Sequence, residues 1–197
     1  MRLGTLAIRG VVGPLFIGHG TQKLFGWFGG HGLEGTAGFF EQALGLRPGK
    51  RHATVAGASE ALGGLMLTLG AMTPLAGAMI SGAMVTAIRK VHGPKGPWAS
   101  EGGYEYNAVI LATMVAISES GPGRPSVDAA MFPRMKGAGW ALLQLAAGAA
   151  GSYLATEVFN EEAPAADQAQ ASDQSAGDDD ARFGRETAEA PSPTPSA

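Results

Sequence analysis

The feature that most constrains the fold is a run of uncharged residues in the middle of the chain. From Ala61 to Ile88, 28 consecutive residues lack a charged side chain. A single helix of that length would exceed the bilayer core, which is about 30 Å thick. Because Thr73-Pro74 interrupts the run, we predict two helices, over about 53–72 and 74–91. Their short connection makes them antiparallel neighbours.

Small residues recur along these two helices. In membrane proteins, glycine and alanine at a helix interface let two backbones approach closely. We therefore expect the two helices to contact each other through small residues, namely Gly57, Ala61, Gly64 and Gly70 on one helix, and Gly77 and Gly82 on the other.

Three further segments have helical, apolar character. Leu3–Thr21 is predicted as an uncleaved first helix kinked at Pro14, and Tyr104–Ser120 as the fourth helix. Gly137–Thr156 is a 20-residue uncharged segment, the length that spans a bilayer. Residues 22–52 are predicted as a polar loop with a short interfacial helix over 36–44.

These elements predict an all-α fold. Residues 1–130 form a transmembrane four-helix bundle, and residues 137–157 add a transmembrane helix. A soluble helical bundle is the alternative, but repeated apolar segments of near-bilayer length disfavour it. The predicted location is the cell membrane, crossed several times. Loop charges do not decide which end faces the cytoplasm.

Charge divides the chain into two unlike parts. Residues from Glu157 onward contain ten acidic and two basic side chains, net −8, whereas residues 1–156 contain seven acidic and twelve basic side chains, net +5. We predict that residues 160–197, rich in Ala, Asp, Ser and Pro, form a disordered acidic tail. The basic residues lie between apolar segments, so the lipid membrane is the expected partner and nucleic acid is not.

Several kinds of site are excluded or disfavoured. The chain contains no cysteine, which excludes disulfides and thiolate chemistry. Gly30–Gly35 has the letters of a dinucleotide-binding loop, but it follows an apolar helix rather than a strand, so we reject that reading. The four histidines have no metal-ligand spacing, and no metal is expected.

Glu60 is the most informative single residue, because it lies inside an apolar helix. A carboxylate in hydrocarbon is costly, so it should face the bundle interior and be paired or protonated. Arg9, on the first helix, is its expected partner. A structural ion pair and a functional acid are equally compatible with this position.

His19 and Lys23 are four residues apart, so both project from one face if the first helix continues that far. With Trp27 and Phe28 just beyond, they form a candidate site for a flat ligand with carbonyl oxygens, such as a quinone. The simpler alternative, which the sequence alone favours, is a histidine near a helix end and a lysine extending toward an aromatic belt.

A third polar group flanks the loop over residues 93–104. His92 ends the third helix together with Arg89 and Lys90, and Glu101 and Tyr106 lie beside the residues that begin the fourth helix, Tyr104, Glu105 and Asn107. Helix dipoles account for much of this pattern. Even so, the topology brings these groups to the same side of the membrane as His19, which is the strongest indication of function.

The same residues carry a family resemblance. H-G-T-Q-K-L-F-G-W-F-G-G, E-A-L-G-G around Glu60, V-H-G-P-K-G-P-W, G-G-Y-E-Y-N and G-P-G-R-P-S-V-D occur in this order between about residues 3 and 128. This pattern resembles the DoxX family of bacterial membrane proteins. The resemblance implies a four-helix integral membrane fold, named for its likeness to DoxD, a subunit of a thiosulfate:quinone oxidoreductase. The matching polar and aromatic positions are His19, Gln22, Lys23, Trp27, Glu60, His92, Tyr104, Glu105 and Asn107.

The preferred function is a component of a membrane oxidoreductase or oxidative-stress system that interacts with quinone-like carriers. His19 and Lys23 would hold ligand oxygens, and Glu60 and Glu105 would serve in proton uptake. A peripheral redox enzyme is then the expected electron donor. The alternative is a non-catalytic membrane scaffold or a small-solute carrier. Catalytic residues, substrate, and whether the chain forms a homo-oligomer stay open.

Overall fold

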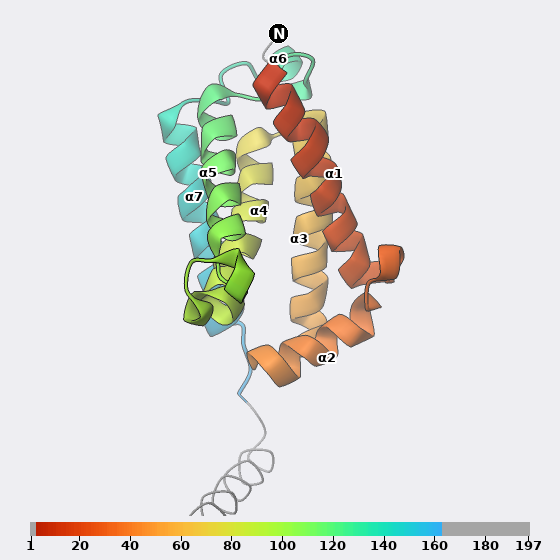
Figure 1. Ribbon diagram of the computed structural model, residues 1–197. Helices are drawn as coiled ribbons and strands as arrows, with labels where there is room; N and C mark the ends of the chain where they lie inside the picture. The colour runs from red at the N-terminus through yellow and green to blue at the C-terminus, as the bar shows by residue number, and fades with distance from the viewer. Residues whose placement is uncertain (1–2, 163–197) are drawn as a thin grey trace, which may run out of the picture. The chain divides into compact units, whose positions relative to one another are not determined.

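The computed structural model describes residues 3–162, and residues up to Glu161 form one compact unit (Figure 1). All but the first three residues of the predicted acidic tail, 160–197, lie outside the described part. The helices are α1 Leu3–Phe25, α2 Gly32–Leu44, α3 Gly49–Leu69, α4 Thr73–Ala87, α5 Glu105–Ser120, α6 Val127–Met131 and α7 Ala138–Tyr153. Short 3₁₀ or π turns are η1 Trp27–Gly29, η2 Ile88–His92, η3 Gly93–Lys95, η4 Ala99–Glu101 and η5 Leu154–Val158.

Within residues 3–162 the structure is helical and contains no strand, so the all-α prediction is confirmed. The break before Pro74 is also present, because α3 ends at Leu69 and Gly70 adopts the left-handed conformation that closes many helices. Across the described helices, none combines the length and the hydropathy required to cross a membrane.

The prediction of a long polar loop over residues 22–52 is wrong. Helix α1 continues to Phe25, α2 occupies Gly32–Leu44, and α3 already begins at Gly49. The predicted short helix over 36–44 is thus the later part of α2, which begins four residues earlier. Local polarity was misleading here because Lys23, at the polar end of α1, is paired with a buried acid on α3.

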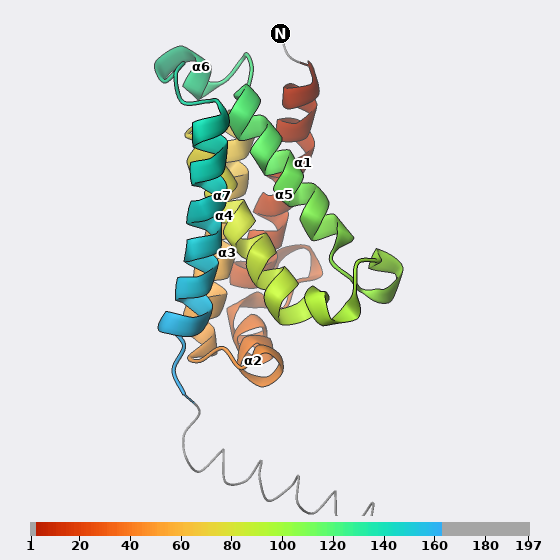
Figure 2. The ribbon, with the colours of Figure 1, turned by 90° about the vertical axis from the view of Figure 1, so that its left-hand side faces the viewer.

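Helix α4 lies at the centre of the bundle, in contact with α3, α5 and α7 (Figure 2). Helix α1 packs on the other side of α3. The apolar core is shared by α1, α3, α4 and α5 and consists of Phe16, Leu67, Ala76, Ile80, Met84, Met114 and Ile117. The sequence-predicted extra helix, α7, is therefore part of the packed bundle, because it covers α4 and α5.

Glycines set the closest helix contacts, but with other partners than predicted. A Cβ atom at Gly20 would lie 2.4 Å from the backbone nitrogen of Ala61 and 2.5 Å from the carbonyl oxygen of Gly57. Gly64 likewise faces Gly13 of α1. The expectation that Gly57 and Gly64 would face the helix over 74–91, now α4, is therefore wrong. This stripe of small residues on α3 faces α1 instead.

The small residues of α4 also face a different helix. A Cβ atom at Gly77 would lie 2.8 Å from Cγ of Gln144, and one at Gly82 would lie 3.2 Å from the carbonyl oxygen of Gly148. Both contacts are with α7. The contact between α3 and α4 instead uses Gly63, which faces Ile80. Helical periodicity defines such stripes, but it does not say which neighbour each stripe meets.

The start of α4 is capped from a distant part of the chain. Asp128 on α6 is buried and accepts hydrogen bonds from the backbone nitrogens of Met72, at 2.7 Å, and Thr73, at 2.8 Å, and from the Thr73 hydroxyl, at 2.6 Å. A carboxylate at a helix N-terminus satisfies otherwise unpaired N–H groups and suits the helix dipole. Asp128 therefore ties the α5–α7 connection to the α3–α4 turn.

We expect Asp128→Asn to lower the free energy of unfolding by about 1–2 kcal/mol, because a charge-assisted acceptor becomes a neutral amide that presents a donor to one of its partners. The measurement is the thermal unfolding midpoint of the purified full chain. Glu119→Gln, at an exposed carboxylate in the same region, is the control and should leave the midpoint unchanged. Equal midpoints for Asp128→Asn and the parent chain would contradict the capping role.

Candidate functional site

The centre of the candidate site is an ion pair between α1 and α3. Nζ of Lys23 lies 2.5 Å from Oε2 of Glu60. The Glu60 side chain is only 8% exposed and the Lys23 side chain 27% exposed, so the lysine reaches the surface while the acid stays inside. The close packing at Gly20 brings the two helices near enough for this contact. Burial makes such a pair expensive unless both partners are present.

The predicted partner of Glu60, Arg9, lies elsewhere. Its guanidinium donates to the carbonyl oxygens of Leu67, Thr68, Pro122 and Pro125, at 2.7–3.2 Å. The helix register explains the error. Gly13 packs at Gly64 and Gly20 at Gly57, and in this antiparallel register Arg9 lies level with the end of α3 rather than with its middle.

His19 and Lys23 both belong to α1, because the helix continues past them as the prediction required. His19 is exposed, and its ring meets Phe16 edge-on at a centroid distance of 6.2 Å. Lys23 points to Glu60. Trp27 lies beyond the helix in η1, and its side chain is 56% exposed. These residues form the Lys23 group: His19, Lys23, Trp27 and Glu60.

The second set of predicted residues gathers where α4 ends and α5 begins. Nδ1 of His92 donates a hydrogen bond to the carbonyl oxygen of Gly102 at 2.6 Å, which closes the loop between the helices. Asn107 is buried and donates to the sulfur of Met84 at 3.4 Å. Tyr104 and Glu105 are half-buried, and their side chains have no hydrogen-bond partner within residues 3–162. These residues form the His92 group: His92, Tyr104, Glu105 and Asn107.

The end of α1 and the start of α5 lie at the end of the bundle opposite to α6, so the two groups lie toward that end, with Glu60 contributed from the middle of α3 (Figure 1). No hydrogen bond or ion pair joins them within the described residues. They are connected through the apolar core, since Phe16, beside His19, and Met84, beside Asn107, belong to the same packed cluster. The arrangement offers two N–H donors, the exposed His19 and the half-buried Lys23, with the Glu60 carboxylate behind the lysine. Within residues 3–162, no three acidic or histidine side chains are close enough to hold a metal ion.

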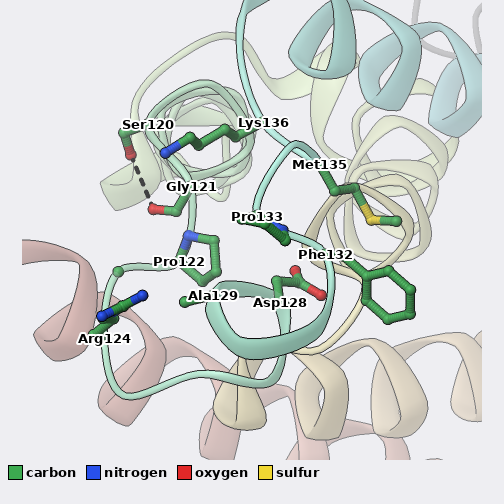
Figure 3. A pocket seen from close by; sticks show the side chains of 11 residues that line it. Ser120, Gly121, Pro122, Arg124, Asp128, Ala129, Phe132, Pro133, Met135 and Lys136 are labelled. Carbon is green, nitrogen blue, oxygen red and sulfur yellow. Dashed lines mark hydrogen bonds between the residues drawn. The ribbon is translucent and has the colours of Figure 1, made fainter.

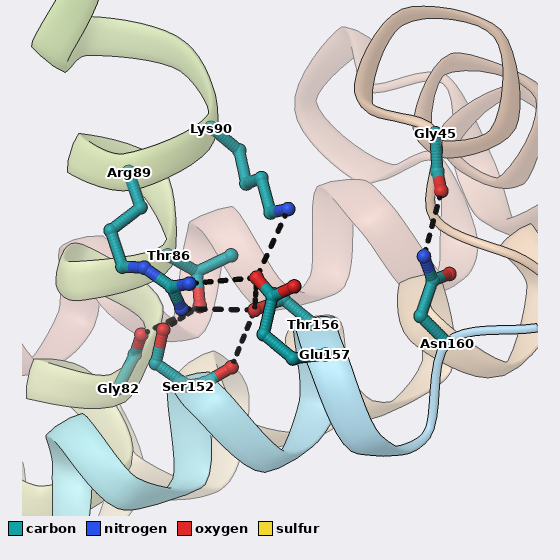
Figure 4. Close-up of polar contacts among 9 residues, drawn as sticks. All are labelled: Gly45, Gly82, Thr86, Arg89, Lys90, Ser152, Thr156, Glu157 and Asn160. Atoms are coloured by element: carbon teal, nitrogen blue, oxygen red, sulfur yellow. Dashed lines mark hydrogen bonds and ion pairs between the residues drawn. The ribbon is translucent and has the colours of Figure 1, made fainter.

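The sequence does not predict a polar network that joins η2, which follows α4, to η5, which follows α7 (Figure 4). Arg89 donates to Glu157 at 2.7 Å and to Thr156 at 2.9 Å, and Nζ of Lys90 lies 3.3 Å from the same carboxylate. On sequence alone, both cations are attributed to the helix dipole. Their acidic partner lies 67–68 residues away, so no local pattern pointed to it.

Comparisons with known proteins agree with the sequence motifs. Residues 4–93, from α1 to η3, match the DoxX family, which confirms the predicted resemblance. The chain is also similar to "Putative oxidoreductase CatD" of Bacillus subtilis (strain 168), with 29% identity over 134 residues, which cover 68% of this chain and 91% of that protein. No solved structure matches the chain.

Proposed function

We propose that this chain, a member of the DoxX family, is a multi-pass membrane component of an oxidoreductase system and binds a quinone-like carrier beside Lys23. The observation that carries the proposal is the Lys23–Glu60 ion pair, whose carboxylate is buried. An apolar pair of similar volume would often be equally or more stable, so a buried ion pair is poorly explained by stability alone. In membrane helices such residues usually have functional roles.

The distribution of polar and apolar side chains supports a lipid environment. Large apolar side chains point outward from the helices, for example Leu62 and Leu69 of α3, Val109 of α5 and Leu142 of α7, each at least 50% exposed. Charged or polar residues lie inside, among them Arg9, Glu60, Asp128 and Gln144, and each of these whole residues is at most 6% exposed. Water-soluble bundles usually show the opposite distribution, with charges outside.

The chemistry of the Lys23 group suits a quinone. The carbonyl oxygens of a quinone accept hydrogen bonds, and both His19 and Lys23 carry N–H donors at the surface of α1. Reduction of a quinone to a quinol takes up two electrons and two protons. Lys23 can donate a proton to a reduced oxygen and becomes a neutral amine. Glu60, a carboxylate in the resting ion pair, can then take up a proton and pass it to this amine across the 2.5 Å contact. The half-buried Glu105 at the same end is the proposed proton entry.

The electrons must come from another protein, a peripheral redox enzyme, because the chain has no cysteine and no haem or flavin motif. The similarity to a protein named as an oxidoreductase supports this reaction class. This role makes the chain the quinone-binding member of a membrane assembly rather than a complete enzyme.

Quinone binding by the purified full chain tests the proposal. Quinones quench tryptophan fluorescence, and Trp27 lies next to the proposed site. We expect Lys23→Gln, which keeps a donor but removes the charge, to weaken binding of a short-chain ubiquinone about tenfold, since a hydrogen bond from a charged donor contributes about 1.5–3 kcal/mol. His19→Ala should weaken it similarly. Lys50→Gln is the matched control, because Lys50 pairs with Glu34 at 2.6 Å on the surface.

Two outcomes would contradict this function. One is a parent chain that does not bind the quinone. The other is equal quinone affinity in the parent chain, Lys23→Gln and His19→Ala. If, in addition, deletion of residues 163–197 abolished the capture of partner proteins, the non-catalytic scaffold would be the better account.

A further inference from the structure

A cavity of about 270 Å³ lies at the opposite end of the bundle, where the end of α5, α6 and the segment before α7 meet (Figure 3). Two cations, Arg124 and Lys136, line it together with apolar side chains, Pro122, Phe132 and Met135. Its volume is slightly below the roughly 300–1,000 Å³ of pockets for drug-sized ligands, so it suits a compact group. The proposed function uses none of these residues.

The two cations are available to a ligand. Neither Arg124 nor Lys136 makes a side-chain hydrogen bond or ion pair within residues 3–162. The one carboxylate that lines the cavity, Asp128, is already engaged. Its two oxygens accept hydrogen bonds from Met72 and Thr73, so its charge is directed toward the start of α4. The cavity therefore has cationic groups that no described acid neutralises.

The loop that carries Arg124 is held in place from the inside of the bundle. Nη1 of Arg9 donates to the carbonyl oxygens of Pro122, at 3.1 Å, and Pro125, at 2.7 Å. The Ser126 hydroxyl donates to the carbonyl oxygen of Gly123 at 2.5 Å. Because Arg9 is buried, these contacts anchor the loop to α1 and preorganise the cavity wall.

We propose that this cavity binds a phosphate-bearing anion and that the headgroup of an anionic lipid is its source. Guanidinium and ammonium groups donate strong hydrogen bonds to phosphate oxygens. The apolar wall, Phe132 and Met135, would meet the part of a lipid next to its phosphate. Val127 and Met131 on α6 are exposed beside the cavity, as expected for a segment at the membrane surface. Basic pockets at the ends of membrane helices bind anionic headgroups.

The test is a thermal-shift titration of the full chain in neutral detergent with three additives: dioleoyl phosphatidylglycerol, dioleoyl phosphatidylcholine and inorganic phosphate. We expect phosphatidylglycerol to raise the unfolding midpoint and phosphatidylcholine not to raise it. The double variant Arg124→Gln/Lys136→Gln should need at least about tenfold more phosphatidylglycerol for the same shift, since each cation near an anionic lipid contributes about 1 kcal/mol. Arg134→Gln is the matched control, because Arg134 is an exposed cation of the same segment that does not line the cavity.

The outcomes separate the ligand sources. If inorganic phosphate alone stabilises the parent chain, and the double variant loses this effect, the anion site is supported and a soluble phosphate compound is its ligand. If the double variant responds to phosphatidylglycerol and phosphate like the parent chain, the proposal is overturned. The proposal would also be overturned if the double variant and Arg134→Gln lost the same part of the phosphatidylglycerol-induced rise in unfolding midpoint. Such a result would mean that the lipid responds to the overall surface charge and not to this cavity. Quinone binding at the Lys23 group is independent of this result.

Discussion

Replacing Gly20 by alanine is expected to lower the free energy of unfolding by about 3 kcal/mol. The added Cβ atom would lie 2.4 Å from the backbone nitrogen of Ala61 and 2.5 Å from the carbonyl oxygen of Gly57. Both are backbone atoms of α3, so no side-chain rotation relieves the overlap. Helix α1 must move away, and the Lys23–Glu60 pair, whose members follow Gly20 and Gly57 by three residues each, loses its geometry.

Gly18→Ala is the matched control for this variant. Gly18 lies on the same helix, but a Cβ atom there would meet no atom within 4 Å. Alanine is a better helix former than glycine by about 1 kcal/mol, so Gly18→Ala should be neutral or slightly stabilising. Thermal unfolding of the parent chain and both variants gives the comparison. Equal midpoints for Gly20→Ala and Gly18→Ala would show that α1 and α3 are not packed as described.

Replacing Lys23 by methionine is expected to have the second large effect. It leaves the Glu60 carboxylate, 8% exposed, without its cation. Breaking a buried ion pair by removing one partner typically costs about 3–5 kcal/mol, because an uncompensated charge stays in the interior. The double variant Lys23→Met/Glu60→Leu removes both charges and should recover most of this loss.

The exposed ion pair Lys50–Glu34 provides the control for the comparison of Lys23→Met with Lys23→Met/Glu60→Leu. Its nitrogen–oxygen distance, 2.6 Å, is nearly the same, but its side chains are 62% and 79% exposed. Exposed ion pairs contribute about 0–1 kcal/mol, so Lys50→Met should cause little change in unfolding free energy. If Lys23→Met were as mild as Lys50→Met, the Lys23–Glu60 pair would not be a desolvated pair, and the proposed function would lose its main support.

Much of the helical framework could be predicted from local sequence. The break at Pro74, the helices over 105–120 and 138–153 and the glycine-rich turns follow from apolar runs and from residues that end helices. The extension of α1 to Phe25 and the early start of α3 at Gly49 could not be predicted in this way. These segments are polar, and they are helical because tertiary contacts such as Lys23–Glu60 satisfy their side chains.

The sequence predicted that the residues of the Lys23 and His92 groups lie toward one end of the bundle, but it did not predict their pairings. The end of α1 and the start of α5, which carry most of these residues, lie at the same end of the bundle (Figure 1). Glu60 pairs with Lys23 and not with Arg9. Arg9 and Asp128 instead organise the opposite end, beside the cavity lined by Arg124 and Lys136. The motif that contains Asp128 carries the family resemblance, but its spacing does not indicate that Asp128 caps α4.

By itself the sequence determined an all-helical chain, the stripes of small residues along its helices and the presence of charged groups that need partners inside it. The tertiary structure decided which stripe meets which helix and which charges pair. Apolar periodicity and helix breakers act over a few residues, so they can be read locally. The axial register between α1 and α3 depends on backbone contacts such as Gly20 with Gly57, which are 37 residues apart, and a shift of one helical turn would give Glu60 a different partner.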